Sequence, residues 1–99
     1  MKLFITGIGT DVGKTIASSI IVEALEADYW KPIQAGDLDN SDTNKVEKYV
    51  SNSTTKFHKN AYALQTPASP HLAAEIDGIT IDINKIIEPV TENHLVIEG

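Results

Sequence analysis

Short apolar runs alternate with helix-like patterns along this chain, and the alternation predicts its elements. An apolar run at 2–6 predicts a first strand. Residues 13–27 predict a helix whose polar stripe carries Ser19, Glu23 and Glu26. The large apolar side chains of this helix, expected to pack away from that stripe, are Ile16, Ile20, Ile21 and Leu25.

The next stretch predicts a second strand and a second helix. Residues 29–33 form a short apolar run, and its strand is expected to end near Pro32, since proline has no N–H to donate to a neighbouring strand. A polar loop at 36–40 leads to a helix that begins near Ser41, with Asn40 or Ser41 as its N-cap. The apolar stripe of this helix is Val46, Tyr49 and Val50.

The centre of the chain has no clear period. Residues 51–70 are rich in Ser, Thr, Asn and Pro, and their expected anchors in the core are Phe57, Tyr62 and Leu64. A short helix is expected at 70–74, and Asp77-Gly78 predicts a turn.

The last part of the chain predicts one more helix and one more strand. The helix is expected at 82–90, because apolar residues recur there at i, i+3, i+4 and i+7, with Pro89 near its end. Those residues are Ile83, Ile86, Ile87 and Val90. The apolar run at 94–97 predicts a strand buried on both faces, and therefore central in a sheet. We expect a chain that stops at such a strand to be the front part of a longer domain.

Alternating strands and helices predict an α/β fold with a parallel sheet flanked by helices, and 99 residues suit a single domain. The net charge of −6 argues against binding to duplex nucleic acid, which attracts basic surfaces. The absence of cysteine excludes disulfides and thiolate zinc sites. The apolar runs are too short for a signal peptide or a membrane span, so a cytoplasmic enzyme is expected.

Residues 7–15 read GIGTDVGKT and directly follow the first predicted strand. A strand, a glycine-rich loop, Gly-Lys-Thr and a helix make the phosphate-binding P-loop arrangement. Lys14 is placed to reach terminal phosphates and the Thr15 hydroxyl to ligate Mg²⁺, so a nucleoside triphosphate is the expected ligand. The usual spacing would place glycine where Ile8 stands, and the competing interpretation is a glycine-rich turn that only joins strand to helix.

Three more candidates accompany this loop. The carboxyl ends of parallel strands share one edge, so Lys14, Lys31 and Glu98 are expected to meet there. A buried lysine needs an anion nearby, and an acid after a buried strand is typical of a Mg²⁺ site. The competing interpretations are a surface lysine, a solvated acid at 98 and, for Asp42, an acid that only favours a helix N-terminus. His71 is interpreted as structural and the acids at 75, 77 and 88 as solvated surface.

Taken together, these motifs resemble the dethiobiotin synthetase family. The resemblance lies in the GIGTDVGKT loop with its extra residue, Lys-Pro at 31–32, Asn-Ser-Asp at 40–42, Ser-Pro-His at 69–71 and the closing Val-Ile-Glu-Gly. These motifs occur in the order of the family and cover the whole chain. Family members are about twice as long, which implies that residues 1–99 are the N-terminal part of a single P-loop ATP-binding α/β domain.

The resemblance also implies an activity: an ATP-dependent ligase that closes the ureido ring of dethiobiotin from 7,8-diaminopelargonate and CO₂, through a carbamate that ATP phosphorylates. It implies Lys14 and Lys31 as catalytic residues, a Mg²⁺ ion on Thr15, Asp42 and Glu98, and a homodimer for the full-length protein. The nucleotide site it implies is Thr10, Asp11, Val12, Gly13, Lys14, Thr15, Ile16, Asp42 and Glu98.

Two departures and two alternatives stay open. Some relatives have a serine that binds substrate just after Lys-Pro, whereas this chain has Ala35 without a hydroxyl, so Gln34 or a backbone group is expected to take that contact. Asp11 stands where glutamate is common among the relatives in this family. The alternatives are a related P-loop protein, such as an amide-forming synthase domain or a partitioning ATPase, and a nucleotide-binding fragment without turnover. The lack of lysine at 7–12 counts against the partitioning ATPases.

Overall fold

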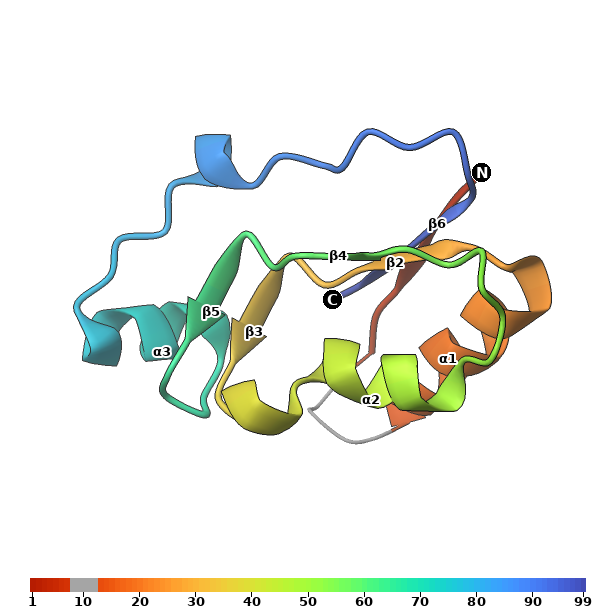
Figure 1. Cartoon of the computed structure of the whole chain (residues 1–99). Helices are drawn as coiled ribbons and strands as arrows, with labels where there is room; N and C mark the ends of the chain where they lie inside the picture. The colour runs from red at the N-terminus through yellow and green to blue at the C-terminus, as the bar shows by residue number, and fades with distance from the viewer. Residues whose placement is uncertain (8–12) are drawn as a thin grey trace.

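A parallel sheet organises the chain in the computed structural model, which describes residues 1–7 and 13–99 (Figure 1). Its order is β1-β6-β2-β4, with β6 in the interior between β1 and β2. The strands are β1 (Lys2–Ile5), β2 (Asp28–Trp30), β4 (Phe57–His58) and β6 (Leu95–Glu98). All three pairings are parallel, which confirms the predicted α/β architecture and the central place of the last strand.

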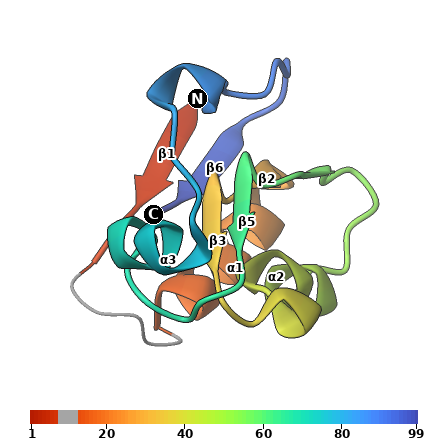
Figure 2. The ribbon, with the colours of Figure 1, turned by 90° about the vertical axis from the view of Figure 1, so that its left-hand side faces the viewer.

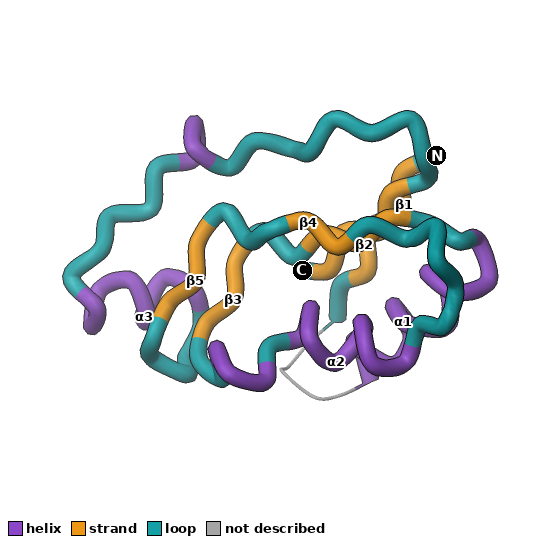
Figure 3. The backbone as a smooth tube through the Cα atoms, in the orientation of Figure 1, coloured by secondary structure: helices purple, strands orange, loops and turns teal. Residues whose placement is uncertain are grey.

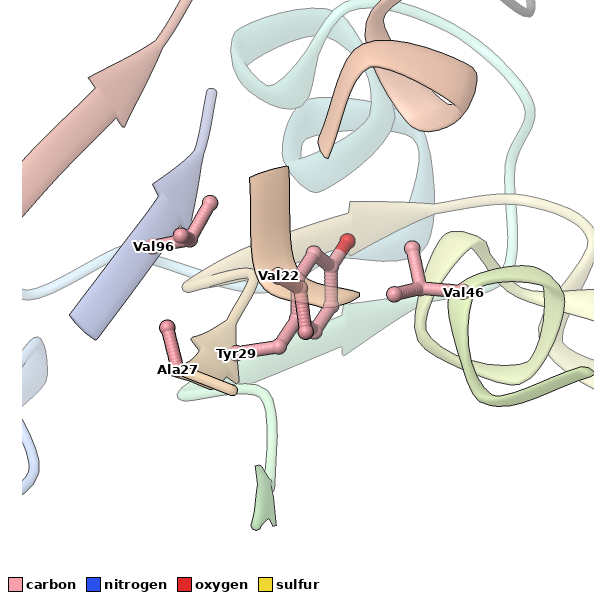
Figure 4. Close-up of a cluster of buried hydrophobic side chains, with 5 residues drawn as sticks. All are labelled: Val22, Ala27, Tyr29, Val46 and Val96. Atoms are coloured by element: carbon pink, nitrogen blue, oxygen red, sulfur yellow. The ribbon is translucent and has the colours of Figure 1, made fainter. Parts of the chain in front are cut away.

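Two helices cover one face of this sheet. Helix α1 (Gly13–Leu25) and helix α2 (Asp42–Tyr49) lie side by side below the strands in Figure 1. Their contact with the sheet forms the main core, drawn in Figure 4. Its fully buried members are Val22, Ala27, Tyr29, Val46 and Val96. The N-cap of α2 is Ser41, as predicted, and its side chain accepts a hydrogen bond from the Asn44 N–H.

A smaller unit stands beside the sheet. Strands β3 (Ile33–Ala35) and β5 (Tyr62–Leu64) pair in parallel, and helix α3 (Pro70–Asp77) packs on them (Figure 2). The core of this unit is Leu64, Ala73 and Ala74. From α3 a long segment runs back to β6, interrupted by a single 3₁₀ turn, Ile83–Lys85 (Figure 3).

That segment corrects the helix predicted at 82–90. Asp82 caps the 3₁₀ turn by accepting a hydrogen bond from the Asn84 N–H, and no helix continues after it. Three of the four residues of the expected apolar stripe are exposed, with Ile83 at 78%, Ile87 at 73% and Val90 at 100%, while Ile86 is half-buried. A helical pattern is not stable without an apolar surface to bury against, and the described residues offer none here.

The buried face of helix α1 matches the prediction only in part. Ile21 and Leu25 pack against the main core, as predicted. Ser18 and Ser19 are buried, whereas Ile16 and Ile20 are exposed. The small side chains let the helix lie close to the sheet, and the Ser19 hydroxyl donates to the Thr15 carbonyl at 2.8 Å. Ser19 of the predicted polar stripe therefore lies on the packed face, while the helix itself and the packing of Ile21 and Leu25 are confirmed.

The strand predicted at 29–33 is split in two. Strand β2 ends at Trp30 and β3 begins at Ile33, so the chain leaves one sheet for the other at Lys31-Pro32. Proline lacks the N–H that would continue the first ladder, and its carbonyl instead accepts from the backbone of Ala61 and Tyr62.

Two of the acids interpreted as solvated have structural partners. Asp77 accepts hydrogen bonds from the backbone N–H groups of Gln65 and Thr66, and from the Thr66 hydroxyl. Glu88 pairs with Lys2 at 2.8 Å. Glu75 and His71 are exposed on α3. In the part of the chain that the structure describes, no helix has the length and apolar character needed to cross a membrane.

Candidate active site

Lys31 lies at the centre of the polar residues that gather where the strands end. It is 8% exposed, at the point where β2 gives way to β3. Its Nζ lies 2.6 Å from Asp42 Oδ2 and 3.4 Å from Glu98 Oε2. Two carboxylates thus offset the cost of burying the ammonium group, and the interpretation of Lys31 as a surface lysine is wrong.

Glu98 is the last residue of β6 and is 1% exposed, so it is not a solvated loop acid. Its Oε1 accepts a hydrogen bond from the Tyr29 hydroxyl at 3.0 Å. Its Oε2 accepts from the Thr15 hydroxyl and from Lys31, both at 3.4 Å. Burial raises the pKa of Glu98, and the neighbouring Asp42 carboxylate adds to the rise against the opposing charge of Lys31.

Asp42 begins α2 and faces Lys31 from the helix side. Burial alone would raise the pKa of Asp42, but the hydrogen bond and charge of Lys31 lower it overall. The Asp42 N–H donates to Gln34 Oε1 at 3.1 Å, and Gln34 Nε2 donates to the Gly36 carbonyl at 3.0 Å. Both ends of the Gln34 amide are therefore engaged with backbone, and this side chain joins β3 to the start of α2.

Lys14 approaches the same edge from the first turn of α1. Its Nζ donates to the Gly99 carbonyl at 3.2 Å, next to the end of β6. Its stem passes close to Gly7, where a Cβ would lie 3.6 Å from Lys14 Cγ. Of the other nucleotide-site candidates, Gly13 and Ile16 are exposed on α1. Thr10, Asp11 and Val12 lie outside the described residues.

A cavity of about 460 Å³ opens beside these side chains. One wall is formed by Ala35 and Pro67, and these segments meet at Gly36. The φ of Gly36 is +76°, and a Cβ at this position would lie 2.5 Å from the Pro67 Cβ. Only glycine allows β3 and the 67–70 segment to approach so closely. The lining includes Lys14, Lys31, Asp42, Ala35 and Ser69.

The side-chain oxygens around Lys31 are of the kind that ligates a hard cation. Thr15 and Glu98 are hydrogen-bonded to each other, and Lys31 bridges Glu98 to Asp42. Mg²⁺ prefers such oxygen ligands and keeps sites for water and phosphate oxygens, so two carboxylates and a hydroxyl are a fitting set. Across residues 1–7 and 13–99, no three or more His, Cys, Asp and Glu side chains group into a metal site of protein ligands alone.

Comparison with known proteins shows the family of the chain. The family model described as "AAA domain" matches residues 1–99. The chain belongs to this AAA domain family. No solved structure matches it.

Similar curated proteins include several named ATP-dependent dethiobiotin synthetase BioD. The protein from Christiangramia forsetii is 68% identical over 96 residues, which are 97% of this chain and 46% of the relative. Those from Chlamydia pneumoniae and Afipia carboxidovorans are 50% and 48% identical, over 98% and 99% of this chain and 43% and 47% of their own lengths. The resemblance seen in the motifs is thus confirmed, and the chain spans about half the length of the curated relatives it matches.

Sequence reasoning about this AAA domain missed Tyr29. Its hydroxyl reaches Glu98, although it lies in an apolar stretch that predicts only a buried strand. One signal was available: Tyr29 and Lys31 are two residues apart, and side chains at i and i+2 of an extended segment share a face. A tyrosine on the face of a candidate site lysine was a reason to expect a polar role.

Proposed function

We propose that this chain belongs to an ATP-dependent dethiobiotin synthetase, a ligase of biotin biosynthesis. The observation that carries the proposal is the convergence of Lys31 with Asp42 and Glu98, beside Lys14, at the carboxyl edge of the sheet. This arrangement gathers cations and oxygen ligands where a triphosphate and an anionic substrate would meet. The name shared by the curated relatives supports the same reaction.

In the proposed reaction, an amine of 7,8-diaminopelargonate adds to CO₂ and loses a proton, which gives a carbamate. The carbamate oxygen attacks the γ-phosphorus of ATP, and ADP leaves. The second amine then attacks the carbonyl carbon of the carbamoyl phosphate, so that phosphate is expelled and the ureido ring closes. Negative charge develops on phosphoryl and carbamate oxygens, which makes the work of the protein mainly electrostatic and positional.

Each cation has a proposed place in this sequence. Lys14 stabilises the phosphoryl group in transfer, together with backbone N–H groups of the 10–16 segment. Lys31 faces the carbamate and the γ-phosphate, and its present partners Asp42 and Glu98 hold it at that edge of the cavity. The contact that a serine makes in some relatives falls to a backbone group, since the Gln34 amide is engaged elsewhere.

Thr15, Asp42 and Glu98 would hold Mg²⁺, which would supply charge neutralisation at the β- and γ-phosphates. We place the enzyme in the cytoplasm, as a homodimer when full length; both statements rest on the resemblance to dethiobiotin synthetases.

The test is turnover by the protein as its gene encodes it, with 7,8-diaminopelargonate, bicarbonate and MgATP, and with dethiobiotin measured by mass spectrometry. Lys14→Ala is expected to lower ATP binding or phosphoryl transfer on the order of 10²-fold or more. Lys48→Met, on the exposed side of α2, is the matched control and should leave both unchanged. ATP binding without dethiobiotin would favour a related P-loop protein instead.

Residues 1–99 alone are expected to be inactive in the same assay. Exposed apolar side chains, among them Ile16, Ile20 and Tyr49, should also make this segment associate, which light scattering would detect. Turnover by a monodisperse monomer of residues 1–99, at the rate of the longer protein, would contradict both expectations.

A further inference from the structure

Tyr29 joins the hydrophobic core to the candidate site. Its side chain is fully buried, and Figure 4 shows the ring among Val22, Val46 and the other core members. The ring also meets the Phe57 ring at a centroid distance of 6.2 Å. Packed from both helices and the sheet, the ring has one position, and so its hydroxyl is a donor at a fixed place.

The two oxygens of Glu98 have different hydrogen-bond partners, and the Tyr29 hydroxyl holds only one of them. Oε1 accepts from Tyr29 at 3.0 Å, whereas Oε2 accepts from Thr15 and Lys31 at 3.4 Å. The shorter contact therefore lies on the core side, and the two longer contacts lie on the site side. A carboxylate held by one oxygen presents the other in a defined direction.

Packing alone does not require this hydroxyl. Phenylalanine would fill the same space in a cluster that is otherwise apolar. A buried hydroxyl is costly unless it is hydrogen-bonded, so its presence in the core is explained by the partner it reaches.

We propose that Tyr29 is a positioning residue that orients Glu98 so that Oε2 faces the divalent cation of the nucleotide site. The proposal rests on the proposed Mg²⁺–ATP site. Groups that hydrogen-bond to metal ligands fix their orientation, and their loss typically lowers metal affinity by about 10- to 100-fold.

The experiment measures divalent-cation affinity rather than turnover. The protein as its gene encodes it is saturated with a non-hydrolysable ATP analogue, and Mn²⁺ binding is followed by electron paramagnetic resonance. Tyr29→Phe is expected to weaken Mn²⁺ binding by about 10-fold or more while the analogue, measured without metal, binds as before. Tyr62→Phe is the matched control, since its hydroxyl accepts from the Asp82 N–H away from the site.

A double-mutant cycle separates positioning from a structural role. In a Glu98→Ala background, Tyr29→Phe should no longer change Mn²⁺ affinity, because the carboxylate through which it acts is gone. Equal losses in both backgrounds, or unchanged affinity in Tyr29→Phe, would overturn the proposal. If the unsubstituted protein binds the analogue but no Mn²⁺, or binds neither, the proposed Mg²⁺–ATP site fails, and the proposal for Tyr29 fails with it.

Discussion

Two carboxylates are buried at opposite ends of the same sheet, and they differ in how their oxygens are used. Asp28 begins β2 and Glu98 ends β6, and each is 1% exposed. Asp28 has four hydrogen-bond donors within 3.2 Å, two on each oxygen. The donors are His58, Thr91, Asn93 and the backbone N–H of Lys56.

The oxygens of Glu98 are held less firmly, since two of its three hydrogen bonds are 3.4 Å long. The pKa values move in opposite directions for this reason. Burial raises both, but at Asp28 the hydrogen bonds from His58 and the other donors outweigh burial and lower the pKa. At Glu98 burial prevails and the pKa rises. Burial therefore does not distinguish a structural acid from a functional one, whereas the satisfaction of its oxygens does.

The largest expected effect comes from removing the Lys31 ammonium group, at the Glu98 end of the sheet. Lys31→Met should lower turnover on the order of 10²-fold or more, since the developing charge on carbamate and phosphate loses its partner. The same variant leaves Asp42 and Glu98 without their counter-ion, so Mg²⁺ should raise its melting temperature more than that of the unsubstituted protein. Lys48→Met should show neither change, and equal Mg²⁺ responses in all three proteins would contradict the contrast between the two ends.

At the Asp28 end of the sheet, the expected loss is in the stability of the fold. Asp28→Asn replaces an acceptor by a donor among four donors, which should lower the free energy of unfolding by about 2–4 kcal/mol. Urea titration measures this, and Asp39→Asn is the control, since Asp39 is exposed in a second 3₁₀ turn, Leu38–Asn40. ATP affinity should stay unchanged in the folded variant. A weakened affinity would show that Asp28 and its hydrogen-bond donors also contribute to the candidate nucleotide site.

A pH series sharpens the comparison further. The lowered pKa of Asp28 gives stability that is present above its usual pKa and lost as the pH falls through the folded value. The raised pKa of Glu98 acts in the opposite sense, because stability declines as the pH rises from its usual value through the folded one. The deficit of Asp28→Asn should therefore shrink on acidification, and Glu98→Gln should gain on the unsubstituted protein as the pH rises. Parallel curves for both variants would contradict this.

The smallest effect is expected at Glu23, a half-buried acid near the surface of α1. Glu23 accepts hydrogen bonds from the side chains and backbone of Ser51 and Asn52, which lower its pKa to about 2. The stability it contributes should be present above its usual pKa and lost as the pH falls toward 2. Glu23→Gln should lower the melting temperature slightly at pH 7 and not at all near pH 2. A drop that persists at low pH would point to packing rather than charge.

The sequence predicted the Glu98 end of the sheet better than the Asp28 end. Lys14, Lys31 and Glu98 could be brought together from sequence because the carboxyl ends of parallel strands share one edge, whereas Asp42 joined them only through the family resemblance. The donors of Asp28 come from Lys56 and His58, at the start and end of the short β4 region, and from the loop at 91–93, and none of these positions follows a period. The same limit explains the missing helix at 82–90 and the burial of Ser18 and Ser19 on α1: periodicity indicates which residues share a face, and only tertiary packing decides what that face meets.

The place of β6 in the sheet has a consequence for the order of folding. Lys2 pairs in register with Leu95, and β6 is also the strand that joins β1 to β2. Neither contact can form until the chain has been synthesised past residue 98, and contacts between such distant residues are slow to close. Because Glu98 is part of β6, the step that places β6 between β1 and β2 is also the step that brings this carboxylate to Lys31. The Lys31–Asp42 pair, by contrast, joins residues that are close in sequence and does not depend on that step.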